Sequence, residues 1–278
     1  MPDQNLTKAQ RRDAARAEAL ELRKAQERRE RRNRTITFVV LGVLVVAVAV
    51  AVVLIMKANK DANTPKALSE VTAPKTANSI DDGGGVPFGK DGVAGTTTDG
   101  AVTVDLYYDY MCPVCGQFEK VNQADIDSMR AAGEITFVAH PVTFLDDRSQ
   151  GTEYSTRAAN AFATVADAEP DKALALHEAL YANRPEENTK GPTDDQIKSI
   201  AEQAGVSDKV ADTFTDKKFS DWADAWTTQI LGDKDLANPS SGSFGTPTIL
   251  INGKMWGTNA EWNTAGALKA AVEAAAKG

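Results

Sequence analysis

The sequence predicts an α/β domain whose single sheet is interrupted by an all-helical block, with one membrane-spanning helix before it. Three observations carry this prediction. An uncharged stretch of 22 residues occupies 35–56. A strand–helix–strand pattern follows over 101–139, and strand signal returns only at 248–256. Between these two parts, from about 150 to 236, apolar residues recur at the spacing of helices.

The first 34 residues form a basic tail. They hold eleven Lys and Arg against six Asp and Glu, whereas the rest of the chain carries a net charge of −13. An acidic body lacks the basic face that phosphate contacts need, so we expect no nucleic-acid partner. We interpret 1–34 as a cytoplasmic polar helix beside an anionic membrane surface.

Residues 35–56 predict an uncleaved transmembrane helix. At about 1.5 Å per residue the stretch measures roughly 33 Å, enough to cross the hydrocarbon core of a bilayer. The alternative, a cleavable signal peptide, normally has shorter apolar and cationic regions, and no convincing cleavage site follows Met56. Arginines crowd the preceding side, so the positive-inside rule places everything after Lys57 outside the cytoplasm. That side is an oxidising space in which disulfides persist.

Residues 57–85 predict a flexible linker, and 86–278 the folded domain. The linker is rich in Ala, Asn, Thr, Pro, Lys and Ser and ends in three consecutive glycines, so it has little apolar surface to bury. It would let the folded domain stand off the membrane.

The domain begins with a short predicted edge strand at 86–88. Residues 101–108 predict a strand that is apolar on both faces, which is typical of a central position. A helix is expected over 112–132, with Gly133 as its C-terminal stop. The next strand, 135–139, should run parallel to 101–108 if the crossover is right-handed.

The helical block and the end of the domain follow. Strand signal returns at 248–251, and Asn252-Gly253 predicts a tight hairpin turn into a return strand at 254–256. Residues 262–275 predict a closing Ala-rich helix. The expected helices of the block are 152–166, 172–182, 193–204, 208–214 and 219–231.

The chain has two cysteines, in the motif Cys112-Pro113-Val114-Cys115. This spacing lets a disulfide form and break within one turn of helix. It also places Cys112 at a helix N-terminus, where unpaired N–H groups and the helix dipole favour a thiolate. Pro113 suits the first turn of a helix because it has no N–H to leave unpaired.

A metal site is a weaker interpretation of the cysteine pair. Structural zinc sites need four ligands, and His140 and His177 are the only histidines that could complete one. We interpret both as structural residues, and we predict no metal and no other cofactor.

Five features of the sequence belong together. They are the segment 108–115, Gln117-Phe118-Glu119, the place of the helical block, Gly245-Thr246-Pro247-Thr248, and Asn252-Gly253-Lys254. Together they resemble the DsbA-like thiol–disulfide oxidoreductases, which have a thioredoxin fold with a helical insertion. The resemblance covers about residues 86–278.

The resemblance implies roles for single residues. Cys112 and Cys115 would be catalytic, and the well-known DsbA pattern has histidine where Val114 stands, which removes one possible partner of the thiolate. Thr246 and a cis Pro247 would form the loop that binds an extended substrate segment. The roles of two acidic residues stay open. Glu119 is either a solvated helix residue or a buried proton relay. Asp109 is either a turn-former or a proton relay near the disulfide.

The function that follows from the resemblance is that of a membrane-tethered thiol oxidase. It would pass the Cys112–Cys115 disulfide to reduced, unfolded exported proteins and be reoxidised by a quinone-linked membrane partner of the DsbB or vitamin-K-epoxide-reductase type. We expect a single-pass protein of the cell membrane, with a cytoplasmic N-terminus and an extracytoplasmic catalytic domain.

Two alternatives stay open. A reductase or isomerase of envelope disulfides would use the same chemistry, although isomerases of this fold usually carry a dimerisation domain that we do not recognise here. A non-enzymatic tethered chaperone or scaffold would keep the cysteine pair as a vestige. The redox potential and the effect of Cys112→Ala on oxidative refolding separate the three.

Overall fold

The computed structural model describes Lys24 and residues 66–79 and 84–277. The predicted membrane span, 35–56, lies outside these residues, as does the tail apart from Lys24. Within the described part of the chain, no helix combines the length and the apolar character needed to cross a membrane.

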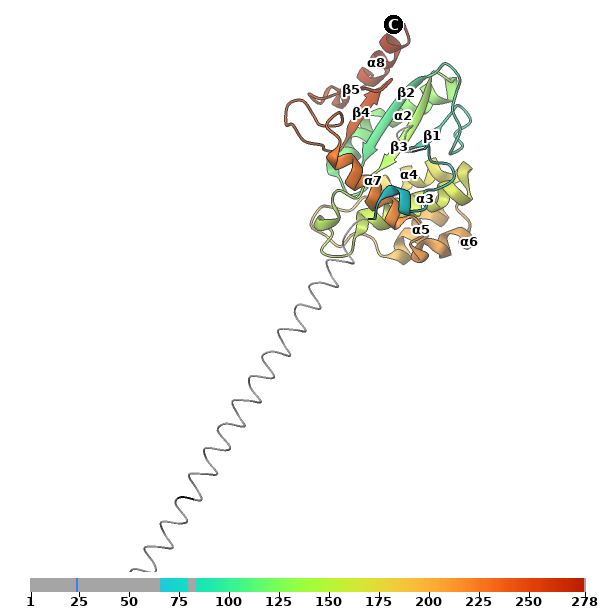
Figure 1. Cartoon of the computed structure of the whole chain (residues 1–278). Coiled ribbons are helices and arrows are strands. Elements are labelled where there is room, and N and C mark those ends of the chain that lie inside the picture. The colour runs from blue at the N-terminus through green and yellow to red at the C-terminus, as the bar shows by residue number, and fades with distance from the viewer. Residues whose placement is uncertain (1–23, 25–65, 80–83, 278) are drawn as a thin grey trace, which may run out of the picture. The chain divides into compact units, whose positions relative to one another are not determined.

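A five-stranded mixed sheet forms the centre of the domain (Figure 1), with strands in the order β1-β3-β2-β4-β5. The central strand β2 pairs in parallel with β3 and antiparallel with β4, and β1 is an edge strand antiparallel to β3. The parallel β2–β3 pair and the edge position of β1 confirm the sequence prediction. The strands are β1 (Val86–Phe88), β2 (Val102–Tyr108), β3 (Ile135–Pro141), β4 (Thr248–Ile251) and β5 (Lys254–Trp256).

Helices follow at the expected places. The block between β3 and β4 gathers in the lower part of Figure 1, and α8 lies at the opposite end of the sheet. Gly133 ends α2 in the left-handed region with φ 78°, as its lack of a side chain allows. The α-helices are α2 (Pro113–Ala132), α3 (Tyr154–Ala168), α4 (Ala173–Ala182), α5 (Asp194–Gln203), α6 (Asp208–Ala211), α7 (Ser220–Gly232) and α8 (Ala267–Ala275).

Two helix predictions need correction. The helix expected over 208–214 ends at Ala211 and continues as a 3-10 helix, Asp212–Asp216. The closing helix, expected from residue 262, begins only at Ala267, because Gly266 has φ 78° and cannot belong to a right-handed helix. Trp262 lies in a short 3-10 helix before it.

Different helices cover the two faces of the sheet. Val104 and Phe137 belong to the main core, which they share with apolar residues of α2 and α8. Tyr107 points to the other face, where it packs in a separate cluster with Trp226 and Ile230 of α7. Helix α2 follows the end of β2 in the chain and packs on the main-core face. The cysteine pair at its N-terminus therefore lies where the central strand ends.

The segment before β1 is packed in its described part. Leu68 and Val71 pack against a cluster that contains Phe219 and Trp222 of the helical block. The Lys75 N–H donates to Asp167 Oδ1 at 2.9 Å, and the Lys66 ammonium lies 2.5 Å from Asp221 Oδ2. Residues 66–79 therefore differ from the expected flexible linker over 57–85, because the block offers an apolar cluster that local composition did not reveal.

Candidate active site

The cysteine pair lies at the N-terminus of α2. Cys112 is the N-cap residue, Pro113 occupies the first helical turn, and the Cys115 N–H donates to Cys112 Sγ at 3.3 Å. Both thiols are free in this structure. The helix start thus directs an unpaired N–H group at the first sulfur, as the motif predicts.

The two thiols have opposite acidities. The Cys115 side chain, which donates a hydrogen bond to the Cys112 sulfur, lowers the pKa of Cys112 to about 6, with further help from Thr246 and from backbone N–H groups. Burial raises the pKa of Cys115 well above its usual range, and the neighbouring Cys112 charge adds to this rise. At neutral pH the pair therefore holds one thiolate, on Cys112, and one thiol, on Cys115.

Both cysteines are largely buried, so little of either sulfur is open to a substrate. Cys112 is only 4% exposed, against 1% for Cys115. The neighbouring Val114 is 44% exposed. The loop before β4 lies against the Cys112 sulfur, so a substrate has to approach beside that loop.

That loop contains the cis bond between Thr246 and Pro247, which confirms the cis prediction. When protonated, the Cys112 thiol donates to the Thr246 carbonyl at 3.5 Å, although 134 residues separate them. The sheet explains the contact. Because β4 runs antiparallel to β2, the end of β2 and the start of β4 lie at the same end of the sheet. Thr246 and Pro247 therefore lie directly beside the reactive sulfur.

Asp109 is fully buried and holds the turn that leads to Cys112. Its carboxylate accepts hydrogen bonds from the Met111 N–H at 2.7 Å, the Leu145 N–H at 2.8 Å and the Ser155 hydroxyl at 2.7 Å. Burial raises the pKa of Asp109 to about 7, although these three donors act in the opposite direction. These three contacts are those of a turn-former, and the Asp109 backbone also hydrogen-bonds the Cys115 sulfur, so Asp109 lies beside the cysteine pair as well.

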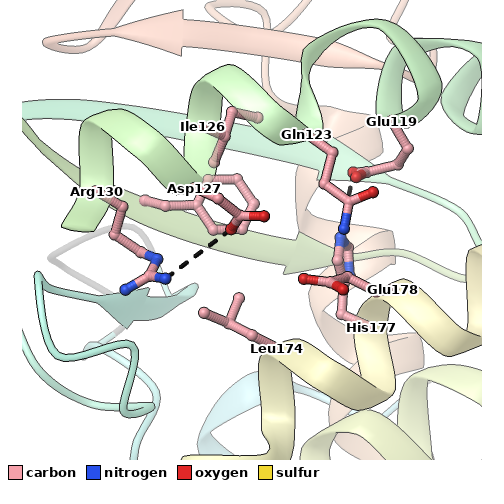
Figure 2. A pocket seen from close by; sticks show the side chains of 9 residues that line it. Glu119, Gln123, Ile126, Asp127, Arg130, Leu174, His177 and Glu178 are labelled. Carbon is pink, nitrogen blue, oxygen red and sulfur yellow. Dashed lines mark hydrogen bonds and ion pairs between the residues drawn. The ribbon is translucent and has the colours of Figure 1, made fainter. Parts of the chain in front are cut away.

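Glu119 is a buried carboxylate and not a solvated helix residue. It lies one turn after Cys115 on the buried stripe of α2 and is 6% exposed. His177 of α4 places Nε2 at 3.1 Å from Glu119 Oε1 (Figure 2). On its other side, His177 Nδ1 lies 3.1 Å from the Tyr110 hydroxyl, which lies 3.2 Å from the Tyr108 hydroxyl.

The sequence did not indicate this buried line of polar groups. His177 is 58 residues from Glu119 and sits in an ordinary helical pattern, so only the packing of α4 against the sheet brings the two together. Tyr108 and Tyr110 stood beside the motif but carried no signal of a role. The second histidine, His140, pairs instead with Asp105 at 2.9 Å, on the face of the sheet that α7 covers.

Neither histidine approaches the cysteines as a metal ligand would. Within residues 66–79 and 84–277, no group of three or more His, Cys, Asp or Glu side chains is placed to hold a metal ion. The arrangement combines one acidic thiol, one buried thiol and a cis-proline loop beside them, which suits thiol–disulfide exchange.

Comparison with known proteins agrees with this geometry. The family model described as Thioredoxin matches residues 90–274. The chain belongs to this family. It is a thiol–disulfide oxidoreductase of the DsbA-like type, with a thioredoxin-like α/β fold and a helical insertion.

Solved structures from Mycobacterium tuberculosis are similar to this oxidoreductase. Oxidised DsbA is 27% identical, with a TM-score of 0.56, over 69% of this chain and 92% of that one. Reduced DsbG, described as a disulfide bond oxidoreductase, is 28% identical, with a TM-score of 0.53, over 65% of this chain and 80% of that one.

A curated relative matches this chain over part of its length. The serine/threonine-protein kinase PknE of M. tuberculosis is 32% identical over 120 residues, which are 42% of this chain. The chain spans only 21% of the length of that relative.

Proposed function

We propose that this oxidoreductase is a membrane-tethered thiol oxidase that donates the Cys112–Cys115 disulfide to reduced, exported proteins. The observation that carries the proposal is the acidity of Cys112. A lowered thiol pKa stabilises the reduced protein, and a stable reduced form makes the disulfide a stronger oxidant. Similarity to the DsbA of M. tuberculosis supports the same direction.

The reaction begins with attack of a substrate thiolate on Cys112 Sγ. The bond between Cys112 and Cys115 breaks, Cys115 leaves as a thiolate and takes up a proton, and a mixed disulfide forms with the substrate. The second substrate thiol then attacks its own sulfur in that bond and expels Cys112. Two electrons pass to the enzyme, and the substrate leaves with a disulfide.

Each neighbouring group supports one of these steps. Cys112 is a good leaving group because its thiolate is stabilised at the helix N-terminus, and Cys115 is a poor one because burial favours its thiol. Thr246 offers backbone groups to an extended substrate segment next to Cys112. Pro247 gives that surface its shape without an N–H that could compete for the sulfur.

The cellular setting is part of the proposal. The apolar stretch 35–56 and the arginines before it support a single-pass anchor, with residues 1–34 in the cytoplasm and the catalytic domain outside. An oxidase is left reduced after each turnover, so it needs a partner that reoxidises its cysteine pair. We propose a quinone-linked membrane protein of the DsbB or vitamin-K-epoxide-reductase type.

The direction of the reaction is tested by redox titration. The purified full-length chain is equilibrated with glutathione buffers, and the fraction of Cys112–Cys115 disulfide is measured by mass after alkylation. We expect a potential well above that of thioredoxin, about −270 mV. A value at or below that of thioredoxin would identify a reductase and end the oxidase proposal.

The enzymatic role is tested by refolding. Catalytic amounts of the oxidised chain should speed the recovery of a reduced, unfolded test protein with two cysteines. Cys112→Ala should abolish the acceleration, because no sulfur remains for the substrate to attack. An undiminished rate in that variant would support a chaperone or scaffold instead.

A further inference from the structure

We propose that Arg184 is a specificity residue of this oxidoreductase, whose guanidinium binds a carboxylate beside the reacting cysteine of the substrate. The inference rests on thiol–disulfide exchange at the cysteine pair and deepens the proposed function, but it holds for either direction of the reaction. The ligand chemistry is a carboxylate one or two residues from a cysteine thiol. Arg184 follows α4, so the helical insertion would take part in choosing substrates.

Arg184 lies against the backbone on both sides of the cysteine motif. Its Nη1 donates to the Met111 carbonyl at 3.2 Å, and Met111 directly precedes Cys112. Its stem reaches Gly116, which directly follows Cys115: a Cβ at this glycine would lie 2.9 Å from Arg184 Nε and 3.1 Å from Cδ. The guanidinium is therefore held beside the first turn of α2, where the disulfide with the substrate forms.

This contact explains why position 116 is a glycine. Gly116 lies within α2 and has no positive φ, so its backbone conformation does not require glycine. Glycine is less favourable than alanine inside a helix. The missing side chain instead provides room for the stem of Arg184, which a Cβ would displace.

Arg184 has hydrogen-bond donors that no protein group uses. A guanidinium carries five N–H groups. Its Nη1 donates to the carbonyls of Met111 and Pro185. The three N–H groups on Nε and Nη2 have no partner among the described residues, and neither nitrogen is a buried atom without a partner, whereas Arg130 Nε is. These three donors are therefore open to a ligand from solvent.

Arg184 also differs in its ion pairing from the other arginines that the structure describes. Each of the others lies within 4.0 Å of a carboxylate: Arg130 with Asp127, Arg148 with Asp147, and Arg157 with Asp194. Among the described residues, Arg184 forms no such pair, although Glu186 and Glu187 follow it closely in sequence. The surrounding chain, 35–278, carries a net charge of −13. The active site thus has beside it an unpaired guanidinium, the group whose planar donors match a carboxylate.

A bound substrate segment brings its own side chains to this place. Thr246 contacts the Cys112 sulfur, so an extended substrate would lie along that loop with its cysteine over Cys112. Successive residues of an extended chain are about 3.3 Å apart. A carboxylate one or two residues from the substrate cysteine is therefore able to reach the guanidinium beside Met111.

Matched peptides test the proposal on the oxidised full-length chain. Each peptide has one cysteine and carries either Glu or Gln one or two residues from it. Single-turnover reduction is followed by acid quench and mass, and each rate constant is divided by the thiolate fraction of the peptide. Wild type should react about fivefold faster with the best Glu peptide than with its Gln partner. About 1 M salt should remove this preference. The acidic domain as a whole repels Glu peptides, so its net charge cannot produce the preference.

Variants separate carboxylate binding from a structural effect. Arg184→Gln should lower the Glu-to-Gln rate ratio to one or below. Loss of the Met111 contact would slow both peptides alike, so it would leave the ratio unchanged. Arg130→Gln removes the same charge near the far end of α2 and should keep the wild-type ratio. A wild-type ratio in Arg184→Gln, or an equal loss in Arg130→Gln, would overturn the proposal.

A binding measurement avoids any change at Arg184. Cys115→Ala traps the mixed disulfide between Cys112 and a peptide, because the second thiol of the pair is missing. The NMR signal of the Arg184 Nε–H should differ between the mixed disulfides of the Glu and Gln peptides. Identical signals would overturn the proposal, even where Arg184→Gln fails to fold.

The source of the carboxylate is decided by a small thiol. Glutathione and its diethyl ester are compared as reductants in the same way. A preference confined to the Glu peptides assigns the site to a protein segment. A preference for glutathione over its ester that Arg184→Gln removes assigns the site to small thiols as well.

The outcomes also separate this inference from the proposed function. A reductase potential ends the oxidase proposal and leaves the carboxylate preference of Arg184 standing. Conversely, equal rates of wild type with the Glu and Gln peptides overturn the preference even where the chain is a strong oxidant.

Discussion

The acidity of Cys112 makes a quantitative prediction about the stability of the reduced protein. The pKa of this thiol falls from 9.0 to about 6 on folding. Three pKa units correspond to about 4 kcal/mol of preferential stabilisation of the thiolate in the folded state. The perturbation that removes it is Cys112→Ser, since a hydroxyl does not ionise in this pH range.

The sign follows from linkage. Because the folded pKa is depressed, the stabilisation is complete above about pH 9 and is lost as the pH falls through about 6. At pH 7 about 1.4 kcal/mol of it remains. Between pH 5.5 and 8 the reduced wild type should therefore gain about 2.5 kcal/mol over Cys112→Ser.

Two assays check this result. Urea unfolding of both reduced proteins gives the difference in free energy of unfolding at each pH. Alkylation by iodoacetamide, with the modified cysteine identified by mass, should show a midpoint near pH 6 for Cys112, and Cys115 should react last. Parallel stability curves, or an alkylation midpoint between pH 8.5 and 9, would refute the reasoning.

Three further predictions concern neighbouring groups. Thr246→Val removes a hydroxyl that lowers the pKa of Cys112, so the alkylation midpoint should rise; an unchanged midpoint would contradict this role. Asp109 has a folded pKa of about 7 against 3.8 unfolded, so wild type should lose stability from about pH 4 to 7, and Asp109→Asn should lack this slope in urea unfolding. Trp222→Ala should cost about 3–5 kcal/mol and expose 66–79 to proteases, and full protection of that segment would argue against its docking.

Local signals made most of the fold predictable. The apolar run of β2, the Gly133 stop after α2 and the Asn252-Gly253 turn each act within a few residues, and the structure has them as expected. The parallel placement of β3 follows from the handedness of crossovers, a general rule. The cis bond before Pro247 came from family resemblance and not from the residues themselves.

What the sequence could not predict depends on distant contacts. The docking of 66–79 joins residues as far apart as Lys66 and Asp221, and its composition alone favours a flexible chain. The Glu119–His177 pair likewise needs the fold to bring α2 and α4 together. Burial of Cys112 depends on the loop before β4, which no local pattern positions.

The helical insertion also controls the segment that leads to the cysteines. Ser155 donates to the Asp109 carboxylate, Tyr181 donates to the Asp109 carbonyl at 3.3 Å, and Arg184 donates to the Met111 carbonyl at 3.2 Å. Met111 directly precedes Cys112, so three insertion residues hold the backbone from which α2 begins. The N–H groups that stabilise the Cys112 thiolate work only if that helix start keeps its geometry. Its acidity is therefore a property of the insertion and the thioredoxin core together, not of the cysteine motif alone.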